Sequence, residues 1–415
     1  MTGVEFSEET RQNTEPLGSA DIVVGIAGPV APEDLRLQAG KIIEELGSSM
    51  GSLRFAFALP GPPDAAGFGT TEQNGHAPLS LVPFSVPAAG AEFWSEVSAN
   101  QRAILSLAAG LKARACIVLG PDLAGLNAHT IQLFSYAILE RQCGLALPVY
   151  PTGKFEGLIN SGILAPLHRA LYGRRIRFPL TYEFAASGAM AARLARHHDA
   201  REGGSLLWPG AIAATQSPQS PLGEVVVDIH HQTALAGLEL STVLGQLTGS
   251  LFYEMERDAP QWQRIRGSQP LPSWGNAPED SGAIEPGDPQ PMLDSFLLGS
   301  KNLDEVWRLV LPPNTMLEIR RLTRLAPDQF HMPDALWASV VYDFALAWRL
   351  RTIGRVHLLG ALTPLYLGWV ASYVREVSSL TRAAAEQRLE QLFRAWEEKK
   401  PYLVSRWRWP DRFNP

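Results

Sequence analysis

A single carboxylate directly follows an apolar run in the first third of the chain. Residues 116–119 are Cys, Ile, Val and Leu, the run ends in Gly120-Pro121, and Asp122 comes next. An acid directly after a buried strand is where many enzymes that act on phosphates place a metal ligand. Such sites usually carry two acids, and here there is one. Three interpretations therefore stay open: a working site, a reduced site, or a turn in which the aspartate bonds its own backbone.

The other residues that could do chemistry are scattered. They are Glu183 in "PLTYEFAASG", the pair His230-His231, and the polar run "PTGKFEGLINSG" at 151–162. Each has a structural interpretation as well, because Glu183 could cap a helix that starts near Ser187 and a histidine that closes a strand commonly packs or bonds a carbonyl. Taken alone, each of these residues favours a structural role.

Several common catalytic patterns are absent from the sequence. There is no GxxxxGK[ST], no GxGxxG after the first strand and no HExxH. Their absence argues against Walker-type ATPases, Rossmann dehydrogenases of the usual kind and zincins.

Alternating strands and helices are expected to position these residues. Apolar runs predict strands and amphipathic runs predict helices, and the two kinds alternate along the first part of the chain. Such alternation indicates a mostly parallel α/β sheet, whose ligands gather beyond the carboxyl ends of the strands, and Asp122 follows such an end. The predicted strands cover 20–28, 53–61, 79–87, the run up to Gly120, 145–151 and 223–232, and the predicted helices include 32–47 and 93–113.

The chain changes character after position 257. Residues 258–291 are dense in Pro, Gly and acids and are predicted to form a linker or long loop. Residues 292–415 have helical periodicity throughout. We therefore expect a disordered start over 1–19, one α/β domain over 20–257 and an all-helical C-terminal extension.

The composition restricts partners and compartment. The net charge of −6 gives no global field that would attract nucleic acid or an anionic membrane. Two cysteines without metal or redox spacing, and a start that lacks an apolar signal core, favour a reduced cytoplasmic setting. Residues 356–374 are apolar, but they contain His357 and Pro364, so a buried helix is expected rather than a membrane span.

One segment resembles a known family. "GKFEGLINSGILAPLHRALYGRRIRFPLTYEFAASG" (153–188) is similar to bacterial glycosyltransferases related to mannosylglycerate synthase and glucosyl-3-phosphoglycerate synthase, and "HLLGALTPLYLGWVASYV" and "KPYLVSRW" resemble their helical extension. The resemblance runs from about Asp21 to Trp407. It implies a GT-A-type fold, in which a nucleotide-diphospho-sugar lies against an α/β sheet with a metal at the pyrophosphate.

The resemblance implies roles for individual residues. Asp122 matches the second acid of the family's Asp-x-Asp-Leu pattern, and His231 matches its metal-binding histidine. These two would hold a divalent Mg or Mn ion, weakly, because the first acid is missing. Glu183 would act near the transferred sugar and the acceptor. The residues that match donor-binding positions are Asp64, Lys154 and Asn160.

The chain also departs from the family's pattern. A lysine expected near the donor appears as Val97, and Asp64 is all that is left of an acidic loop. The resemblance implies transfer of a sugar from a nucleotide-sugar donor to a small hydroxy-acid-type acceptor, with retention of configuration. The alternative is a catalytically degenerate homologue that binds a sugar, a nucleotide or a protein. A structural subunit is the third class, and a homo-oligomer stays open.

Overall fold

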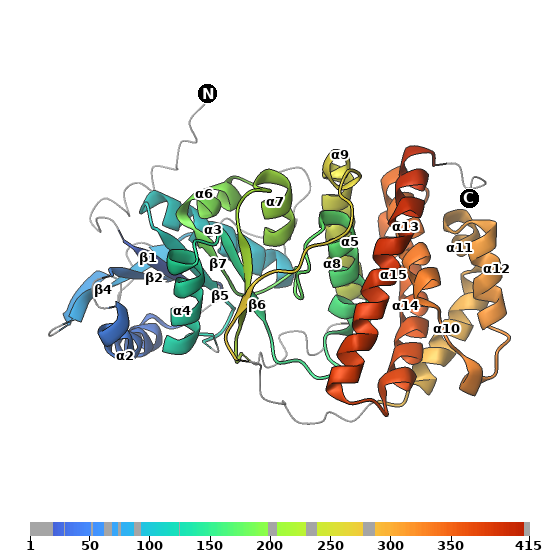
Figure 1. Ribbon diagram of the computed structural model, residues 1–415, viewed down its shortest axis with the longest axis horizontal. Coiled ribbons are helices and arrows are strands. Elements are labelled where there is room, and N and C mark those ends of the chain that lie inside the picture. The colour runs from blue at the N-terminus through green and yellow to red at the C-terminus, as the bar shows by residue number, and fades with distance from the viewer. Residues whose placement is uncertain are drawn as a thin grey trace. The chain divides into compact units, whose positions relative to one another are not determined.

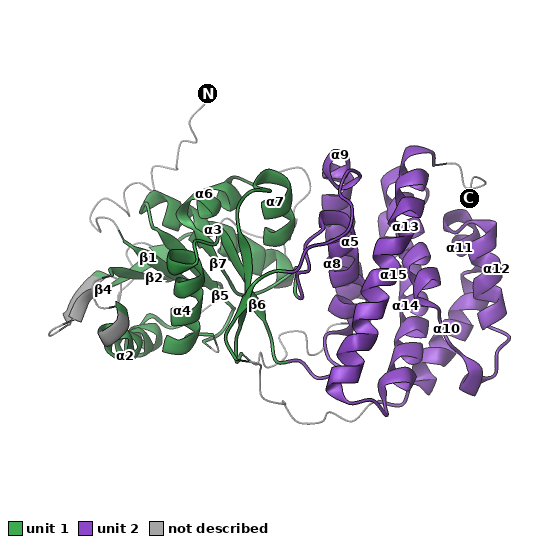
Figure 2. Ribbon diagram, in the orientation of Figure 1, with its two compact units in different colours: residues 1–151, 178–232, 271–279 green, residues 152–177, 233–270, 280–415 purple. Residues whose placement is uncertain are grey.

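The computed structural model describes most of the chain. The described residues are 20–28, 30–50, 53–61, 69–73, 76–86, 93–123, 125–197, 206–229, 239–276 and 287–410. They divide into two compact units. The sheet unit consists of residues 1–151, 178–232 and 271–279, and the helical unit consists of residues 152–177, 233–270 and 280–415 (Figure 2).

A nine-stranded sheet forms the core of the sheet unit. Its strand order is β3-β4-β2-β1-β5-β7-β6-β8-β9. The neighbouring strands pair in parallel except β3, which is antiparallel to β4, and β7, which is antiparallel to both β5 and β6. The strands are β1 (Ile22–Ile26), β2 (Phe55–Pro60), β3 (Gly69–Gln73), β4 (His76–Phe84), β5 (Ala115–Leu119), β6 (Leu145–Val149), β7 (Phe184–Ser187), β8 (Leu222–Val226) and β9 (Ser273–Trp274).

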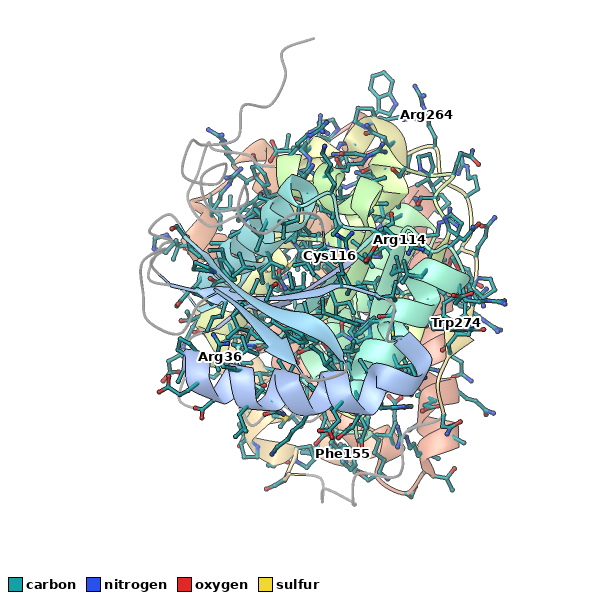
Figure 3. All side chains as sticks on the ribbon, turned by 90° about the vertical axis from the view of Figure 1, so that its left-hand side faces the viewer. Arg36, Arg114, Cys116, Phe155, Arg264 and Trp274 are labelled. Carbon is teal, nitrogen blue, oxygen red and sulfur yellow. The ribbon has the colours of Figure 1, made fainter. Side chains whose placement is uncertain are left out.

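Helices cover both faces of this sheet, which explains why its central strands are apolar without alternation. Helices α2 (Pro32–Met50) and α4 (Ala128–Ser135) pack on one face (Figure 1), where their apolar side chains form one cluster with those of β1, β2 and β5. On the other face lies α3 (Phe93–Gly110), which approaches β1 so closely that a Cβ on Gly25 would lie 2.3 Å from Ile104. Cys116, in the central strand β5, is fully buried (Figure 3).

Two more α-helices belong to the sheet unit, as does the short π-helix η2 (Tyr136–Glu140). Helix α6 (Gly188–Arg196) packs against α3, and α7 (Pro209–Gln216) packs against α6 and β6. The side chain of Ser187 begins α6, because its Oγ accepts a hydrogen bond from the Met190 N–H at 3.3 Å. Ser187, and not Glu183, is therefore the residue that caps this helix.

The helical unit is built around buried tryptophans. Trp337 of α13 stacks on Trp369 of α14 with ring centroids 6.1 Å apart, and its indole N–H donates to the Gly162 carbonyl at 2.8 Å. Its helices are α5 (Ala165–Tyr172), α8 (Leu240–Arg257), α9 (Ala259–Trp262), α10 (Gln290–Asn302), α11 (Asp304–Val310), α12 (Pro313–Leu322), α13 (Asp334–Leu350), α14 (Arg355–Val377) and α15 (Arg382–Arg408), with π-helical η3 (Asn160–Leu164) preceding α5.

The boundary between the units differs from the predicted one at 257. Helix α5 packs along α15, and α8 packs along α14, so both belong to the helical unit. Part of the predicted linker over 258–291 also has a defined place, since β9 pairs with β8. Trp274 of β9 lies over Gly223 of β8. A Cβ on Gly223 would be 2.2 Å from the Trp274 ring, so only glycine leaves room for the tryptophan at this position.

The predicted fold class, an α/β sheet followed by an all-helical C-terminal extension, is confirmed. The 356–374 segment forms most of α14, whose side chains are buried along much of its length. Among the described residues, no helix combines the length and apolarity needed to cross a membrane.

Candidate functional site

One antiparallel strand brings the candidate residues to one edge of the sheet. Strand β7 lies between β5 and β6 and runs opposite to both, with Phe184 paired to Val118. The start of β7 therefore lies at the edge where β5 and β6 end. We call the four residues at this edge the carboxyl-edge cluster: Asp122, which follows β5, Tyr150, which follows β6, and Tyr182 and Glu183, which precede β7.

Glu183 is a fully buried acid held by a neutral hydroxyl. Its side chain is 0% exposed, and its Oε2 accepts a short hydrogen bond from the Tyr150 hydroxyl. The Glu183 backbone N–H in turn donates to the Tyr150 oxygen at 3.5 Å. Phe178 packs edge-on against the Tyr150 ring at 5.0 Å. Burial, followed by the charge of Glu183, raises the pKa of Tyr150 well above its ordinary value, so this hydroxyl stays a hydrogen-bond donor.

Asp122 shares an electrostatic environment with Glu183. Burial raises the pKa of Tyr182 above its ordinary value, and the charges of Glu183 and Asp122 raise it further. Both carboxylates therefore act on the same hydroxyl. Gly125 lies close to two other segments. A Cβ at this position would be 3.6 Å from Cγ of Glu183 and 3.3 Å from Cδ1 of Ile229, which follows β8.

The turn that carries Asp122 is fixed by its backbone. The Ala27 N–H, just after β1, donates to the carbonyls of Leu119 and Gly120 at 3.1 and 3.3 Å. Gly28 then passes so close that a Cβ would lie 2.1 Å from the Pro121 carbonyl oxygen. Asp122 itself is half-buried at this turn. The turn interpretation and a ligand-binding role are therefore compatible, since a rigid turn can present a carboxylate.

Helix α3 supports the segment before Glu183. The Gln101 side-chain amide donates to the carbonyls of Thr181 and Tyr182, both at 3.0 Å. The Trp94 ring stacks on the Tyr182 ring with centroids 4.6 Å apart and planes 3° apart. Val97, one turn along α3 from Trp94, is 2% exposed and contributes an apolar side chain where the resemblance led us to expect a lysine.

Sequence reasoning missed Tyr150, Trp94 and Gln101 as contributors to the cluster. None belongs to a recognisable pattern. The available signal was weaker: Trp94 and Gln101 lie seven residues apart, and therefore on one face of a helix. Tyr150 was detectable only as the residue that ends an apolar strand.

Two predicted donor-binding residues lie in the helical unit. The Lys154 amine donates to the carbonyls of Val377, Ser378 and Leu380 at 3.0, 2.9 and 2.8 Å, at the end of α14. The Asn160 amide donates to the Arg177 carbonyl at 2.8 Å.

Arg169 and Tyr172, which also match the resembling segment, bind acids of the same unit. Arg169 pairs with Glu390 and Glu397 at 2.6 and 2.8 Å, and the Tyr172 hydroxyl lies 3.2 Å from an Asp258 oxygen.

The remaining predicted residues lie outside the described part of the chain. These are Asp64 and the pair His230-His231. Strand β8 ends at Val226, so the alternation of side chains along that strand does not determine the direction of His231. Of the predicted site residues, the structure brings Asp122 and Glu183 together.

A metal site cannot be assembled from the described residues alone. None of them belongs to a group of three or more His, Cys, Asp or Glu side chains that could hold a metal ion. Asp122 fits one ligand position, because it is half-exposed at the carboxyl edge. A complete donor set would need a ligand beyond the described residues, for which His231 is the prediction, and oxygens from a bound diphosphate.

Comparisons with known proteins returned structures only. No protein-family model matches the chain, and no curated protein sequence matches it significantly. The chain is similar to glucosyl-3-phosphoglycerate synthase from Mycobacterium tuberculosis in complex with phosphoglyceric acid, at 12% identity and a TM-score of 0.38, over 62% of this chain and 85% of that one. A second structure of that enzyme, with Mn²⁺, UDP-glucose and phosphoglyceric acid, is 14% identical with a TM-score of 0.37, over 68% of this chain and 96% of that one. Scores this low leave the function to be argued from the site.

Proposed function

We propose that this chain is a GT-A-type glycosyltransferase homologue that binds a nucleotide-sugar at the carboxyl edge of its sheet. The observation that carries the proposal is that antiparallel β7 starts at the edge where β5 ends, so that Glu183 and Asp122 belong to the same edge of the sheet. Open α/β sheets bind their ligands beyond the carboxyl ends of their strands. The resemblance of residues 153–188 to sugar transferases adds the ligand class.

Each acid has a proposed part in sugar transfer. Breaking the bond between sugar and phosphate leaves negative charge on the diphosphate, and a divalent Mg or Mn ion held by Asp122 and His231 would neutralise that charge. Glu183 would orient the donor sugar or the hydroxyl of a small hydroxy-acid acceptor, with transfer proceeding with retention. Asp64, Lys154 and Asn160 stay proposed donor contacts, and Lys154 would first have to leave the carbonyls of α14.

A second candidate function is ligand binding without transfer. It is favoured by the complete burial of Glu183 beneath its bond to Tyr150 and by the buried valine at position 97. In that case the carboxyl edge recognises a sugar or nucleotide, and the catalytic steps are lost. Both candidates fit a cytoplasmic protein whose two cysteines are free and buried.

A donor screen separates these functions. The purified chain is tested by thermal shift with UDP-glucose and GDP-mannose, with and without Mn²⁺, and then incubated with 3-phosphoglycerate while released nucleoside diphosphate and new glycoside are measured. Transfer by the wild type that is lost in Glu183→Gln supports the transferase. Metal-dependent stabilisation by a donor without turnover supports the binding protein. Absence of any donor effect overturns both.

A further inference from the structure

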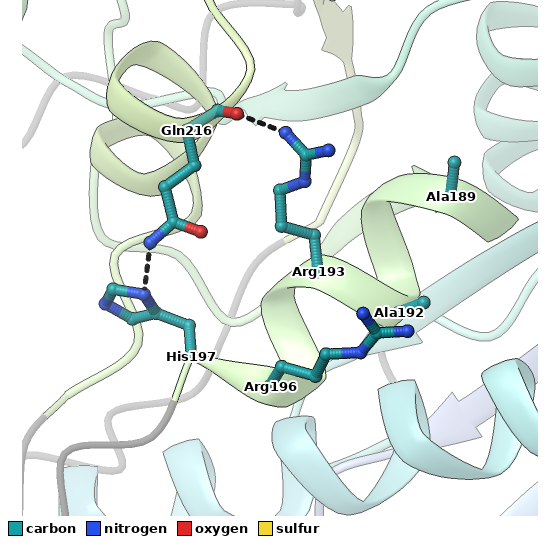
Figure 4. A pocket seen from close by; sticks show the side chains of 6 residues that line it. All are labelled: Ala189, Ala192, Arg193, Arg196, His197 and Gln216. Atoms are coloured by element: carbon teal, nitrogen blue, oxygen red, sulfur yellow. Dashed lines mark hydrogen bonds between the residues drawn. The ribbon is translucent and has the colours of Figure 1, made fainter. Parts of the chain in front are cut away.

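Helix α6 presents a second chemical surface on the sheet unit. Its buried face consists of Met190, Ala191 and Leu194. A different face carries a stripe with the spacing i, i+3, i+4, i+7. That stripe begins with two small side chains and ends with two cations: Ala189, Ala192, Arg193 and Arg196 (Figure 4).

This stripe lines a pocket of about 300 Å³, which we call the arginine pocket. The alanines occupy little space, and the longer side chains border the hollow. The lining residues are Ala189, Ala192, Arg193, Arg196, His197 and Gln216. None of them belongs to the carboxyl-edge cluster.

Contacts with the end of α7 orient His197 and Arg193 before any ligand arrives. The Gln216 side-chain nitrogen lies 2.6 Å from Nδ1 of His197, which directs the imidazole (Figure 4). Nη1 of Arg193 donates to the Gln216 carbonyl and to the Ser217 hydroxyl. Both contacts restrict side-chain rotation, so a ligand would lose less entropy on binding.

The charge of the pocket is not balanced within the described part of the chain. No Asp or Glu lines it, and no carboxylate among the described residues pairs with Arg193 or Arg196. Arg193 and Arg196 are exposed, whereas Arg169 and Arg388 of the helical unit lie largely buried and pair with acids. The chain has a net charge of −6, so these two guanidinium groups make the hollow locally positive on a negatively charged protein.

We infer that the arginine pocket binds the phosphate group of a small phosphorylated molecule. Guanidinium groups match phosphate oxygens in paired, charge-assisted hydrogen bonds, and an imidazole adds a further donor. A volume of about 300 Å³ suits a phosphate monoester with a short carbon skeleton, whereas a flat surface would retain no small ion. This site is additional to the proposed sugar-nucleotide site.

A simpler account of the two arginines is that cations stabilise the C-terminal end of α6 through the helix dipole. That account explains the charge but neither the hollow nor the oriented imidazole beside it. It also predicts a measurable difference, because dipole stabilisation needs no ligand.

The test is isothermal titration of the full chain at constant ionic strength with inorganic phosphate and with glycerol 3-phosphate, and with glycerol as the uncharged control. We expect saturable one-to-one binding of both phosphates. Arg196→Gln, which removes a side chain without a hydrogen bond to any described residue, should weaken binding about tenfold. The double variant R193Q/R196Q should abolish it. K41Q/K112Q removes two exposed charges from the same unit and should leave binding unchanged.

Two further variants make the result decisive. Asp122→Ala should leave phosphate binding unchanged, because the arginine pocket shares no residue with the carboxyl edge. The next acids along the chain, Asp199 and Glu202, lie outside the described residues. Phosphate binding that occurs only in D199N/E202Q would show that the chain's own acids neutralise the arginines. That result would overturn the inference, as would equal binding by wild type and R193Q/R196Q, or binding of heparin and RNA without any binding of phosphate.

Discussion

Individual acids of the two units can be compared by the groups that bond them. In the helical unit, Asp343 is 1% exposed and accepts from the Tyr402 hydroxyl at 2.8 Å and from Arg406 at 3.4 Å. Glu390, which is half-buried, accepts two bonds from the Arg169 guanidinium. In the sheet unit, Glu183 accepts from the neutral hydroxyl of Tyr150. Guanidinium groups therefore bond these acids of α13 and α15, whereas a tyrosine hydroxyl bonds Glu183. In both units burial raises the pKa of the tyrosine beside the acid, and the charge of the acid raises it further.

The comparison distinguishes an acid bonded by a cation from an acid bonded by a neutral hydroxyl. A carboxylate that is paired with a guanidinium stabilises two helices and has little field left for a third partner. A bond from a neutral hydroxyl stabilises a carboxylate without offsetting its charge. The following substitutions test that distinction.

The largest effect is expected from Arg169→Met. This guanidinium is 3% exposed and bonds Glu390 and Glu397 of α15. Its removal takes one cationic partner from each of these two partly buried acids. We expect the free energy of unfolding to fall by about 3 kcal/mol, as when one partner of a buried ion pair is removed. Chemical denaturation measures it. Arg394→Gln is the matched control, because Arg394 also bonds Glu390 but is 66% exposed, and it should cost under about 0.5 kcal/mol. Equal losses in the two variants would contradict the account.

Asp343 should make the helical unit sensitive to pH. Burial raises its pKa from 3.8 to about 7, although Arg406 and Tyr402 act in the opposite direction. A raised folded-state pKa means that the folded chain binds the proton more tightly than the unfolded chain. Stability should therefore decline as pH rises from about 4 to 7, by roughly 1 kcal/mol per pH unit at the steepest point. Asp343→Asn should flatten this slope in denaturation curves recorded across that window. An unchanged slope would show that Asp343 is ionised throughout.

Tyr150→Phe removes the hydroxyl that holds Glu183. Hydrogen bonds to charged groups typically stabilise by about 1.5–3 kcal/mol, and we expect a loss of about 2 kcal/mol. Tyr136→Phe, at a half-exposed tyrosine of the same unit, should change stability by less than about 0.5 kcal/mol. A double-mutant cycle measures the loss caused by Y150F in the wild type and in E183Q. Equal losses in the two backgrounds would show that the two side chains are not coupled.

Gln101→Met should have a smaller effect at the same place. The amide supports two backbone carbonyls, at Thr181 and Tyr182, and methionine fills a similar volume without donating to them. We expect a loss of about 1–2 kcal/mol. Glu96→Gln, at an exposed position of α3, serves as the neutral control. A Gln101→Met protein as stable as wild type would show that α3 does not support the segment before Glu183.

The sequence was sufficient to predict the layers of the fold. Apolar runs such as Ile22–Ile26 and the periodic stripe of Pro32–Met50 carry their secondary structure in their own pattern. It was not sufficient to predict β7, because "FAAS" is only four residues long and no periodicity indicates that a strand is antiparallel. Yet this strand decides the site, since its direction brings Glu183 to the edge where Asp122 lies.

The division into units was also hidden from sequence. The amphipathic face of a helix shows that the helix packs against something, but not against which layer, and so α5 and α8 were expected beside the sheet. Within the candidate site, Asp122 and Glu183 were predicted from their positions and from the family resemblance, and their roles stay predictions. Supporting residues such as Gln101 were missed, because an amide inside a helix becomes meaningful only when the carbonyls it reaches are known.

Titration calorimetry with UDP, in the presence and absence of Mn²⁺, tests the central claim that the carboxyl edge binds a nucleoside diphosphate. We expect weak binding that requires the metal and is reduced roughly ten- to a hundred-fold by Asp122→Ala and by His231→Ala, as the loss of one charged contact predicts. Tight binding without metal, or binding indifferent to both substitutions, would contradict the claim and leave Asp122 as a turn residue.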